Sequence, residues 1–552
     1  MKYSGAEIII KMLEMHGIET IAGIPGGANL PLYNALYNSN IRHILARHEQ
    51  GAGFIAQGIA RSTGKPAVCF ATSGPGATNL ITAIADAKLD SIPIIAITGQ
   101  VSTSLMGTDA FQEADTYGMT IPITKHNFLV RHASELISVI NDAFNIATEG
   151  RPGPVLIDVP KDVQMQIMDI DGFYIDRPIK IESDIRKEPI AKAAAMINNS
   201  KQPVLYIGGG IIHSGAHQEI ISIAEKNSIP VTSTLMGLGN IPENHPMFIG
   251  MLGMHGARYT NHILEEADLL IGLGVRFDDR ATGNVAKFCP NAAILHIDID
   301  PAELNKIKTA TLDIVGDVRD ILGQIQPLIE ENKRTEWQAR IDQLRKEQPF
   351  TLPKHENIYH PLNLIRAIGS LAPDDAIITT DVGQHQMWVA QVYPFSKPRT
   401  LLTSGGLGTM GFGLPTAIGA ALANPDRKVI CFSGDGSILM NIQELATLAE
   451  LNLNITVVLL NNGHLGLVRQ QQKLFYNSNY IASRFENNPD FSAIAKGFGI
   501  GSFDLSATND PETAIQDALS SNKPSFINVP INYEEMVTPM VPPGKANIEM
   551  IG

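Results

Sequence analysis

The chain has 552 residues, of which 44% are hydrophobic and 18% charged, and its formal net charge is −14. This composition is typical of a well-packed globular protein and excludes a largely disordered one. The acidic balance argues against nucleic acid or an anionic membrane surface as a partner. For this length we expect about three to four domains.

Nothing in the sequence predicts export or membrane insertion. No apolar run approaches the roughly 18–20 residues of a membrane span, and the N-terminal pattern is that of an amphipathic helix rather than a signal peptide. The three cysteines, Cys69, Cys289 and Cys431, are an odd number without paired spacing. We therefore expect a cytoplasmic protein with reduced thiols rather than disulfides or a cysteine metal site.

Residues 1–165 alternate short apolar runs with helical patterns. Residues 21–24, 67–71, 92–98 and 155–159 read as strands, most of them ending in Gly, Thr, Ser or Asp. Such alternation predicts a parallel α/β domain. The charged, aperiodic residues from about 165 to 190 predict a linker.

A second α/β domain is predicted over residues 190–335. Strands are expected within 203–210, 228–239, 267–280 and 292–300, several ending in glycines or acids as in dinucleotide-binding sheets, although no GxGxxG motif is present. Residues 330–358 predict a charged helix and a proline-containing connector, hence a second linker. The third domain covers 358–535, and the tail 536–552 has no helix or strand signal. The expected fold class is α/β, with three doubly wound parallel-sheet domains.

Residues 428–464 carry the strongest local signal. The apolar run 429–432 breaks at Gly434-Asp435-Gly436, a helical pattern follows from Leu439 to Ala449, and the run 455–460 ends at Asn461-Asn462. In a parallel sheet both strand ends share one edge, so Asp435 and Asn462 could meet there and bind Mg²⁺ with a diphosphate. The glycines and the following helix start would favour the diphosphate. Each motif alone is an ordinary turn or strand end; the combination is more specific.

Residues 68–80 and 429–440 resemble each other as strand, Gly-rich turn and helix start. Internal duplication and chance convergence on one supersecondary unit both explain this likeness.

Two further features allow a structural and a functional interpretation. Glu49 precedes a run of small and apolar residues, and it either caps that helix or is held in a partly dry site for proton transfer. The run SGGLGTMGFGLP, residues 404–415, is either a tight turn or backbone that approaches a flat ligand, with Met410 as an apolar wedge.

Eleven motifs extend the signal from about residue 5 to the PMVPPG tail: GIPGGANLP, RHEQGAGFIAQGIAR, SGPGATNL, GTDAFQEAD, GRPGPVLIDVPKDV, LGMHG, VRFDDR, TTDVGQHQMW, GTMGFGLP, GDGS and LLNNGHLGLVRQQQKLFY. In content and order they resemble the catalytic subunits of acetohydroxyacid synthase (acetolactate synthase), a thiamine-diphosphate (ThDP) enzyme family. The segment HLGLVRQQQKLF is most similar to the enterobacterial isozyme I branch. The resemblance implies decarboxylative condensation of pyruvate with pyruvate or 2-ketobutyrate, the first common step of branched-chain amino acid biosynthesis.

The resemblance implies specific roles in the ThDP domains, the pyrimidine-binding first and the diphosphate-binding third. Glu49 would hydrogen-bond the aminopyrimidine N1′, so that the 4′-imino nitrogen can take the C2 proton. Magnesium would be held by Asp435, Asn462 and the carbonyl of His464. The residues implied to line ThDP are Val382, Gly383, Gln384, His385, Gly408, Met410, Gly436 and Ser437. Further active-site positions are Gly26, Gly27, Phe111, Gln112 and Lys161.

The central domain resembles the family's FAD-binding domain, where the flavin is not thought to change redox state. Its implied flavin positions are Arg151, Gly208, Gly209, Gly210, Thr234, Leu235, Leu252, Gly253, Met254, His255, Gly274, Arg276, Asp298, Ile299 and Asp317. Arg280 matches the arginine that receives the second substrate's carboxylate, a task suited to a guanidinium fork. Taken alone, Arg280 would equally suit an ion pair with Asp278 or Asp279.

One departure from the family concerns the second substrate. Many members carry Trp where this chain has Gln471, and that Trp favours 2-ketobutyrate. An extra methylene in a good apolar pocket contributes about 1–3 kcal/mol, so we expect weak discrimination between the two ketoacids here.

The alternatives are pyruvate oxidase, glyoxylate carboligase, which lacks the glutamate matched by Glu49, and catabolic acetolactate synthase, which lacks FAD. A nucleotide-binding regulatory protein would require Glu49 and Asp435 to be structural only. The resemblance also implies a homodimer or homotetramer, with Glu49 facing another subunit's Mg²⁺ site, and a small regulatory subunit.

Overall fold

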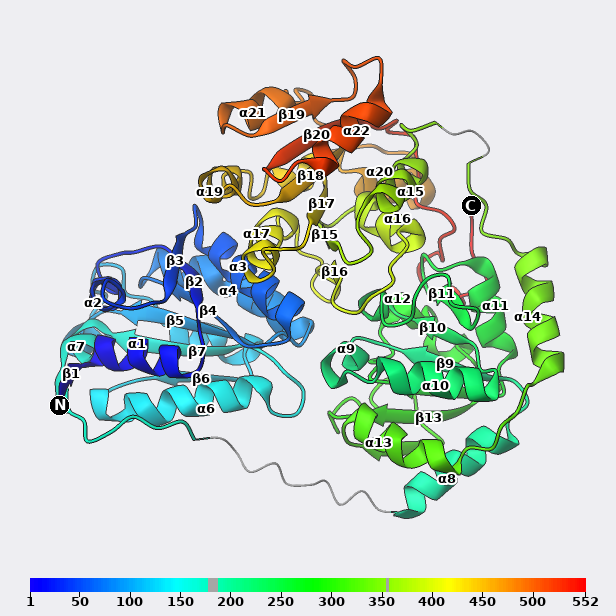
Figure 1. Ribbon diagram of the computed structural model, residues 1–552, viewed down its shortest axis with the longest axis horizontal. Coiled ribbons are helices and arrows are strands. Elements are labelled where there is room, and N and C mark those ends of the chain that lie inside the picture. Colours follow the sequence, from blue (N-terminus) through cyan, green and yellow to red (C-terminus); the bar gives the residue numbers. More distant parts are fainter. Residues whose placement is uncertain (177–186, 354–356) are drawn as a thin grey trace.

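The computed structural model describes residues 1–176, 187–353 and 357–552, and it contains three six-stranded parallel sheets (Figure 1). Buried apolar side chains cover both faces of each sheet. In β4, for example, Val68 and Phe70 point into one cluster, and Cys69 and Ala71 into another. The predicted class of three α/β domains is confirmed. All three cysteines are buried and free, and no helix in the described ranges is long and apolar enough to cross a membrane.

The first sheet has the strand order β3-β2-β4-β5-β7-β6. The four predicted strands are confirmed, whereas the short edge strands β3 and β6 were not predicted. The elements are β1 (Lys2–Ser4), α1 (Gly5–Met15), β2 (Thr20–Gly23), α2 (Leu30–Leu36), β3 (Arg42–Leu45), α3 (Glu49–Thr63), β4 (Ala67–Ala71), α4 (Pro75–Leu89), β5 (Ile94–Gln100), α5 (Thr116–Thr120), β6 (His126–Leu129), α6 (Leu136–Thr148), β7 (Val155–Pro160), α7 (Lys161–Met165) and β8 (Ile167–Asp169).

The segment predicted as the first linker is partly structured. Its strand β8 pairs antiparallel with β1, so the start of this segment packs with the first domain. Residues 177–186 of the predicted linker lie outside the described residues.

The central sheet has the order β11-β10-β9-β12-β13-β14, which is the 3-2-1-4-5-6 order of dinucleotide-binding folds. The elements are α8 (Lys187–Asn199), β9 (Pro203–Ile207), α9 (Gly210–Ser214), α10 (His217–Asn227), β10 (Val231–Ser233), β11 (Phe248–Met251), α11 (Arg258–Glu266), β12 (Leu269–Leu273), α12 (Asp279–Thr282), β13 (Ala293–Asp298), β14 (Leu312–Val315), α13 (Val318–Ile325) and α14 (Thr335–Glu347).

Helix α14 corrects the second predicted linker. The helix itself is confirmed, but it belongs to the central core rather than to a connector. Trp337, Ile341 and Leu344 lie on one face and are buried against α11 and the sheet. Its many charges occupy the other face, and their number concealed this narrow apolar stripe.

The third sheet has the order β16-β15-β17-β18-β20-β19. Numbered within each domain, the first and third sheets therefore share the order 2-1-3-4-6-5. The elements are α15 (Pro361–Leu371), β15 (Ile377–Thr380), α16 (Gln384–Val392), β16 (Leu401–Leu402), α17 (Gly413–Ala423), β17 (Val429–Gly434), α18 (Asp435–Ile438), α19 (Glu444–Leu451), β18 (Ile455–Asn461), α20 (Gly466–Phe475), α21 (Phe491–Gly497), β19 (Gly501–Asp504), α22 (Pro511–Ser520) and β20 (Ser525–Pro530).

The helix predicted after Gly436 is wrong as a single element. Helix α18 ends at Ile438, and α19 begins only at Glu444. Within the break, the Asn441 side chain donates to the Gly411 carbonyl and to Gln50 Oε1, so tertiary hydrogen bonds replace helical ones.

Helices α3 and α17 join the first domain to the third. A Cβ on Gly58 would overlap the Thr416 carbonyl, and one on Gly419 would overlap the Ile55 carbonyl. Only glycine allows the two backbones to approach this closely. This crossing fixes the start of α3 beside the third domain.

The tail 536–552 has no helix or strand, as predicted, apart from an isolated bridge between Met540 and Ile551. It leaves the third domain and packs on the central one. The Val541 N–H donates to the Met254 carbonyl, and Asn547 Nδ2 donates to the Ala281 carbonyl.

Candidate active site

Strands β17 and β18 bring Asp435 and Asn462 to one corner of the third sheet, as predicted. The strands are parallel neighbours with Gly434 opposite Leu460. The Gly463 N–H donates to Asp435 Oδ2, and Asn462 Oδ1 accepts from the His464 N–H at 3.0 Å. Burial raises the pKa of the Asp435 carboxyl to about 6, although backbone N–H bonds act in the opposite direction.

This corner offers hard oxygen donors from a carboxylate and an amide. Among residues 1–176, 187–353 and 357–552, no cluster of three or more His, Cys, Asp or Glu side chains could hold a metal. A cation at Asp435 would therefore need further oxygens from a bound anion and water, which fits Mg²⁺ with a diphosphate.

The turn after β15 forms the neighbouring wall. Ser437 Oγ donates to the Val382 carbonyl at 2.7 Å, and Gln384 Oε1 accepts from Asn462 Nδ2 at 3.3 Å. Burial lowers the pKa of His385 to about 3, and its Nε2 is buried without a partner among the described residues. The buried Nε2 without a partner is a group that a bound ligand would satisfy, whereas Cε1 and Nδ1 of the same ring lie against Gly383 and Gly434.

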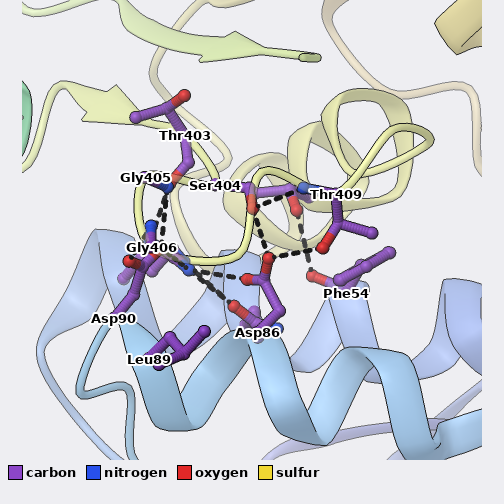
Figure 2. A network of polar contacts seen from close by, with 12 residues as sticks. Phe54, Asp86, Leu89, Asp90, Thr403, Ser404, Gly405, Gly406 and Thr409 are labelled. Atoms are coloured by element: carbon purple, nitrogen blue, oxygen red, sulfur yellow. Dashed lines mark hydrogen bonds and ion pairs between the residues drawn. The ribbon is translucent and has the colours of Figure 1, made fainter. Parts of the chain in front are cut away.

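The glycine-rich loop before α17 is held by a buried ionic network from the first domain (Figure 2). Arg61 Nη2 donates to Asp86 at 3.0 Å and to Asp90 at 2.9 Å, and the three side chains are at most 4% exposed. Asp90 accepts from the N–H groups of Gly405 and Gly406, at 3.0 and 2.7 Å.

The second carboxylate of this network reaches further along the loop. Asp86 Oδ2 accepts from the hydroxyls of Ser404 and Thr409. Burial raises the pKa of Asp86, and the charge of Asp90 adds to that effect. The loop position therefore depends on α3 and α4, and this network sets the place of Gly408 and of the half-buried Met410.

Glu49 is the first residue of α3 and is 8% exposed. Capping does not explain it, because His48 is the N-cap and its Nδ1 accepts from the Gln50 N–H. Instead, Glu49 Oε2 accepts from Asn79 Nδ2 at 2.9 Å. The carboxylate is thus buried and held by a side chain of α4.

The other positions implied in the first domain lie in loops. Phe111 is 89% exposed, and Gln112 adopts a φ of +60° against Gly74. Gly27 is exposed, and Lys161 begins α7. No hydrogen bond or ion pair in the described part of the chain joins these residues to the Asp435 corner.

A cavity of about 1800 Å³ lies between the three domains, and it gathers all but one of the implied flavin positions. Its lining includes Arg151, Gly208, Gly209, Gly210, Thr234, Leu235, Leu252, Met254, His255, Gly274, Arg276, Asp298, Ile299 and Asp317, together with Gly408, Arg280 and Gln471. Gly253 is outside the lining and instead packs against the Arg280 backbone.

The cavity has an open glycine wall and buried polar groups, which suit a bound nucleotide. A Cβ on Gly208 would overlap the carbonyl of Gly274, whose φ is +57°, so glycines keep this wall open. Burial lowers the pKa of His255 to about 4 and leaves its Nδ1 unpartnered within the described residues. Burial also raises the pKa of Asp298 to about 6.

Several polar side chains of the cavity already have protein partners. Arg151 pairs with Asp300 at 3.2 Å and Glu303 at 2.6 Å. Asp317 caps α13 by accepting from the Arg319 and Asp320 N–H groups.

Arg280 faces the same cavity with its side chain 70% exposed. Its Nη1 is 3.7 Å from Asp279 Oδ2, whereas Asp278 caps α12. A single exposed ion pair of this length contributes little to stability. The guanidinium therefore remains able to donate hydrogen bonds to a ligand carboxylate. Gln471, on α20, lies on the same wall and is exposed.

Glu444 is a residue that motif reasoning missed. It is fully buried and bonded to the start of α3. An acid inside the otherwise apolar face of a helical pattern was the only signal in the sequence.

Comparison with known proteins identifies the class. The models of the N-terminal TPP binding domain, the central domain and the C-terminal TPP binding domain of thiamine pyrophosphate enzymes match residues 3–119, 190–325 and 381–529. The chain is therefore a thiamine pyrophosphate enzyme with all three domains of that class.

Relatives define the family within this class. The chain is 57% identical to the acetolactate synthase isozyme 1 large subunit of Escherichia coli (strain K12), over 100% of this chain and 98% of the relative. It is 44% identical to the isozyme 2 large subunit of the same organism, over 99% of both chains. It is 46% identical to an acetolactate synthase of Arthrospira platensis, over 100% of this chain and 98% of the relative. The chain belongs to the acetolactate synthase large-subunit family.

Proposed function

We propose that the protein condenses pyruvate with a second 2-ketoacid, pyruvate or 2-ketobutyrate, with release of CO₂. The products are 2-acetolactate and 2-aceto-2-hydroxybutyrate, and the reaction is the first common step of branched-chain amino acid biosynthesis. The main support is the Asp435–Asn462 corner, whose donors suit a metal-bound diphosphate, in a chain that matches acetolactate synthases along its length.

The cofactors are ThDP, Mg²⁺ and FAD. Residues 1–165 take the pyrimidine side of ThDP, residues 358–535 the diphosphate and metal, and residues 190–335 the flavin. When bound, ThDP supplies a nucleophilic carbon and an electron sink for decarboxylation. Asp435, Asn462 and the His464 carbonyl hold Mg²⁺, and the turn Val382–His385 with Gly436 and Ser437 holds the diphosphate.

Glu49 would hydrogen-bond the aminopyrimidine N1′ of bound ThDP and exchange a proton there, which prepares the cofactor for reaction. Its carboxylate is oriented by Asn79 at 2.9 Å. Gly408 and Met410 would contact the bound cofactor, on a loop held by Asp86 and Asp90. Gly27, Phe111, Gln112 and Lys161 complete the reacting side.

Substrate selection lies at the cavity wall. Arg280 binds the carboxylate of the second ketoacid, and Gln471 faces its alkyl group. The polar Gln471 provides little apolar contact for an extra methylene, so preference for 2-ketobutyrate is weak.

Assembly follows the family. The protein forms a homodimer or homotetramer, in which the exposed Phe111 is covered, and it binds a small regulatory subunit. The name "large subunit" of its relatives and the 89% exposure of Phe111 support this part of the proposal.

The first experiment measures acetolactate formation from pyruvate with ThDP, Mg²⁺ and FAD, each omitted in turn. Glu49→Gln is the critical variant and the exposed Glu19→Gln its matched control. We expect loss of at least about a hundredfold in turnover for Glu49→Gln only. Normal turnover of this variant would refute the role of Glu49.

Competition between pyruvate and 2-ketobutyrate at equal concentrations tests the selectivity. We expect similar amounts of both products, and a shift of roughly tenfold or more toward acetohydroxybutyrate in Gln471→Trp. A strong excess of that product in the unaltered protein would contradict the role of Gln471.

A further inference from the structure

Glu444 belongs to the third domain but binds the start of α3 in the first. Its Oε1 accepts from the backbone N–H groups of Arg47 at 2.9 Å and His48 at 3.1 Å. Its Oε2 accepts from Thr447 Oγ1 at 2.7 Å. The side chain is fully buried, and its desolvation raises its pKa. A buried carboxylate with three hydrogen bonds holds its partners firmly.

The local backbone is shaped for this contact. A Cβ on Gly51 would overlap Glu444 Oε1, so glycine admits the carboxylate at this turn of α3. The break between α18 and α19 also lets Asn441 donate to Gln50 Oε1 at 3.1 Å. Residues 47–51 are therefore held by the third domain on both sides of Glu49.

We propose that Glu444 is a positioning residue for Glu49. The inference rests on the proposed function, because it assumes that Glu49 acts on the bound cofactor. Glu444 fixes the two N–H groups that immediately precede Glu49, and that anchor sets the direction in which the Glu49 carboxylate projects. A displacement of about 1 Å in a reacting group can cost roughly a hundredfold in rate.

The same segment also carries the metal corner. Asp435 begins α18 and Glu444 begins α19, so residues 435–444 connect the two. A change at the diphosphate corner can thus reach the start of α3 through one short stretch of backbone. The helix break is the structural reason that this connection exists.

Substitutions at Glu444 distinguish a role in positioning Glu49 from a role that only stabilises the contact between the domains. Gln can accept from Arg47 and His48 through Oε1 and donate to Thr447 through Nε2, so Glu444→Gln keeps the geometry without the charge. Glu444→Ala removes the anchor. Glu450→Ala is the matched control, because within the described ranges the exposed Glu450 pairs only with the Arg47 side chain.

The measurements are kcat, KM for pyruvate, the ThDP Kd at fixed Mg²⁺, the exchange rate of the ThDP C2 proton, and amide hydrogen exchange of residues 45–54 without cofactor. For Glu444→Ala we expect kcat and the rate of C2 proton exchange to fall about tenfold or more. Amide exchange of residues 45–54 should become faster. KM for pyruvate and the ThDP Kd should stay within about twofold of the values for the unaltered protein. Glu444→Gln and Glu450→Ala should remain within about threefold of the unaltered protein.

Two results would overturn the inference. One is normal C2 exchange in Glu444→Ala, and the other is a loss of ThDP affinity that equals the loss of kcat and is not rescued by Gln. Glu49→Gln distinguishes the two proposals. If Glu49→Gln is inactive while Glu444→Ala is normal, only the positioning role fails; if Glu49→Gln is fully active, the proposed role of Glu49 fails first.

Discussion

The first and third domains share one sheet order, yet the turn after their third strand differs. After β4, the chain enters α4 at Pro75 and remains helical for 15 residues. After β17, the chain reaches Asp435, and the helix stops after four residues. The sequence likeness of 68–80 and 429–440 thus falls on equivalent elements of two similar sheets.

The difference shows that each domain holds a segment of the other that carries predicted site residues. The long α4 places Asp86 and Asp90 under the glycine-rich loop of the third domain (Figure 2). The interrupted helix of the third domain places Glu444 against the start of α3. One scaffold therefore carries two complementary contacts, one made by each domain.

A second likeness strengthens the comparison. LIDVP in β7 and FINVP in β20 occupy the fifth place of their sheets, with Asp158 matched by Asn528. Two matching strands in an identical strand order favour internal duplication over chance convergence.

The largest expected effect is at Asp435, the carboxylate in the turn after β17, because the corresponding turn after β4 has no carboxylate. Asp435→Asn should reduce activity at least about a hundredfold at low Mg²⁺, because it removes the one charged donor of the corner. Titration of ThDP binding with Mg²⁺ measures this, with exposed Asp426→Asn as control. An unchanged Mg²⁺ dependence would mean that Asp435 has only a structural role, like the turn after β4 in the first domain.

The contact between the two domains can be broken at α3. Gly58→Ala places a methyl group against the Thr416 backbone, and we expect a loss of about 1–3 kcal/mol in stability. Gly323→Ala on the exposed face of α13 is the matched control, since its Cβ meets nothing within 4 Å and should be neutral or stabilising. Thermal unfolding compares the two, and equal midpoints would show that the helices can separate without cost.

The last prediction makes the first domain like the third at Asp158. Burial raises the pKa of this carboxyl to about 7, and it accepts from Thr98 and Gln100. The folded state therefore holds the proton more tightly, so stability falls as the pH rises from about 4 to 7, by at most about 1.4 kcal/mol per pH unit.

Asp158→Asn removes this titration and can retain both contacts, because the Thr98 hydroxyl can also accept. We expect the thermal midpoint of the unaltered protein to fall more between pH 5 and 8 than that of the variant. Parallel decreases would indicate that Asp158 is already ionised at pH 5.

The sequence predicted the parts of this molecule that depend on local patterns. Buried strands such as β4 and β17 are continuous apolar runs, and Asp435 and Asn462 meet because parallel strand ends share an edge. The cavity that gathers Arg151, His255 and Arg280 follows from motif positions, although their roles stay predictions.

What the sequence did not predict depends on contacts between distant segments. The edge strand β3 is short and mixed in polarity. The helix break at 439–443 is stabilised by bonds to Gly411 and Gln50, which no local pattern reports. Arg61 meets Asp86 and Asp90 only because α3 and α4 pack side by side.

The two tryptophans give the molecule an uneven optical signature. Trp337 is buried in the central domain on α14, and Trp388 is buried on α16 in the third domain, while the first domain has none. Selectively excited tryptophan fluorescence during denaturation therefore reports on two domains and has no reporter in the one that carries Glu49. If far-ultraviolet circular dichroism changes before the fluorescence does, the first domain has unfolded alone.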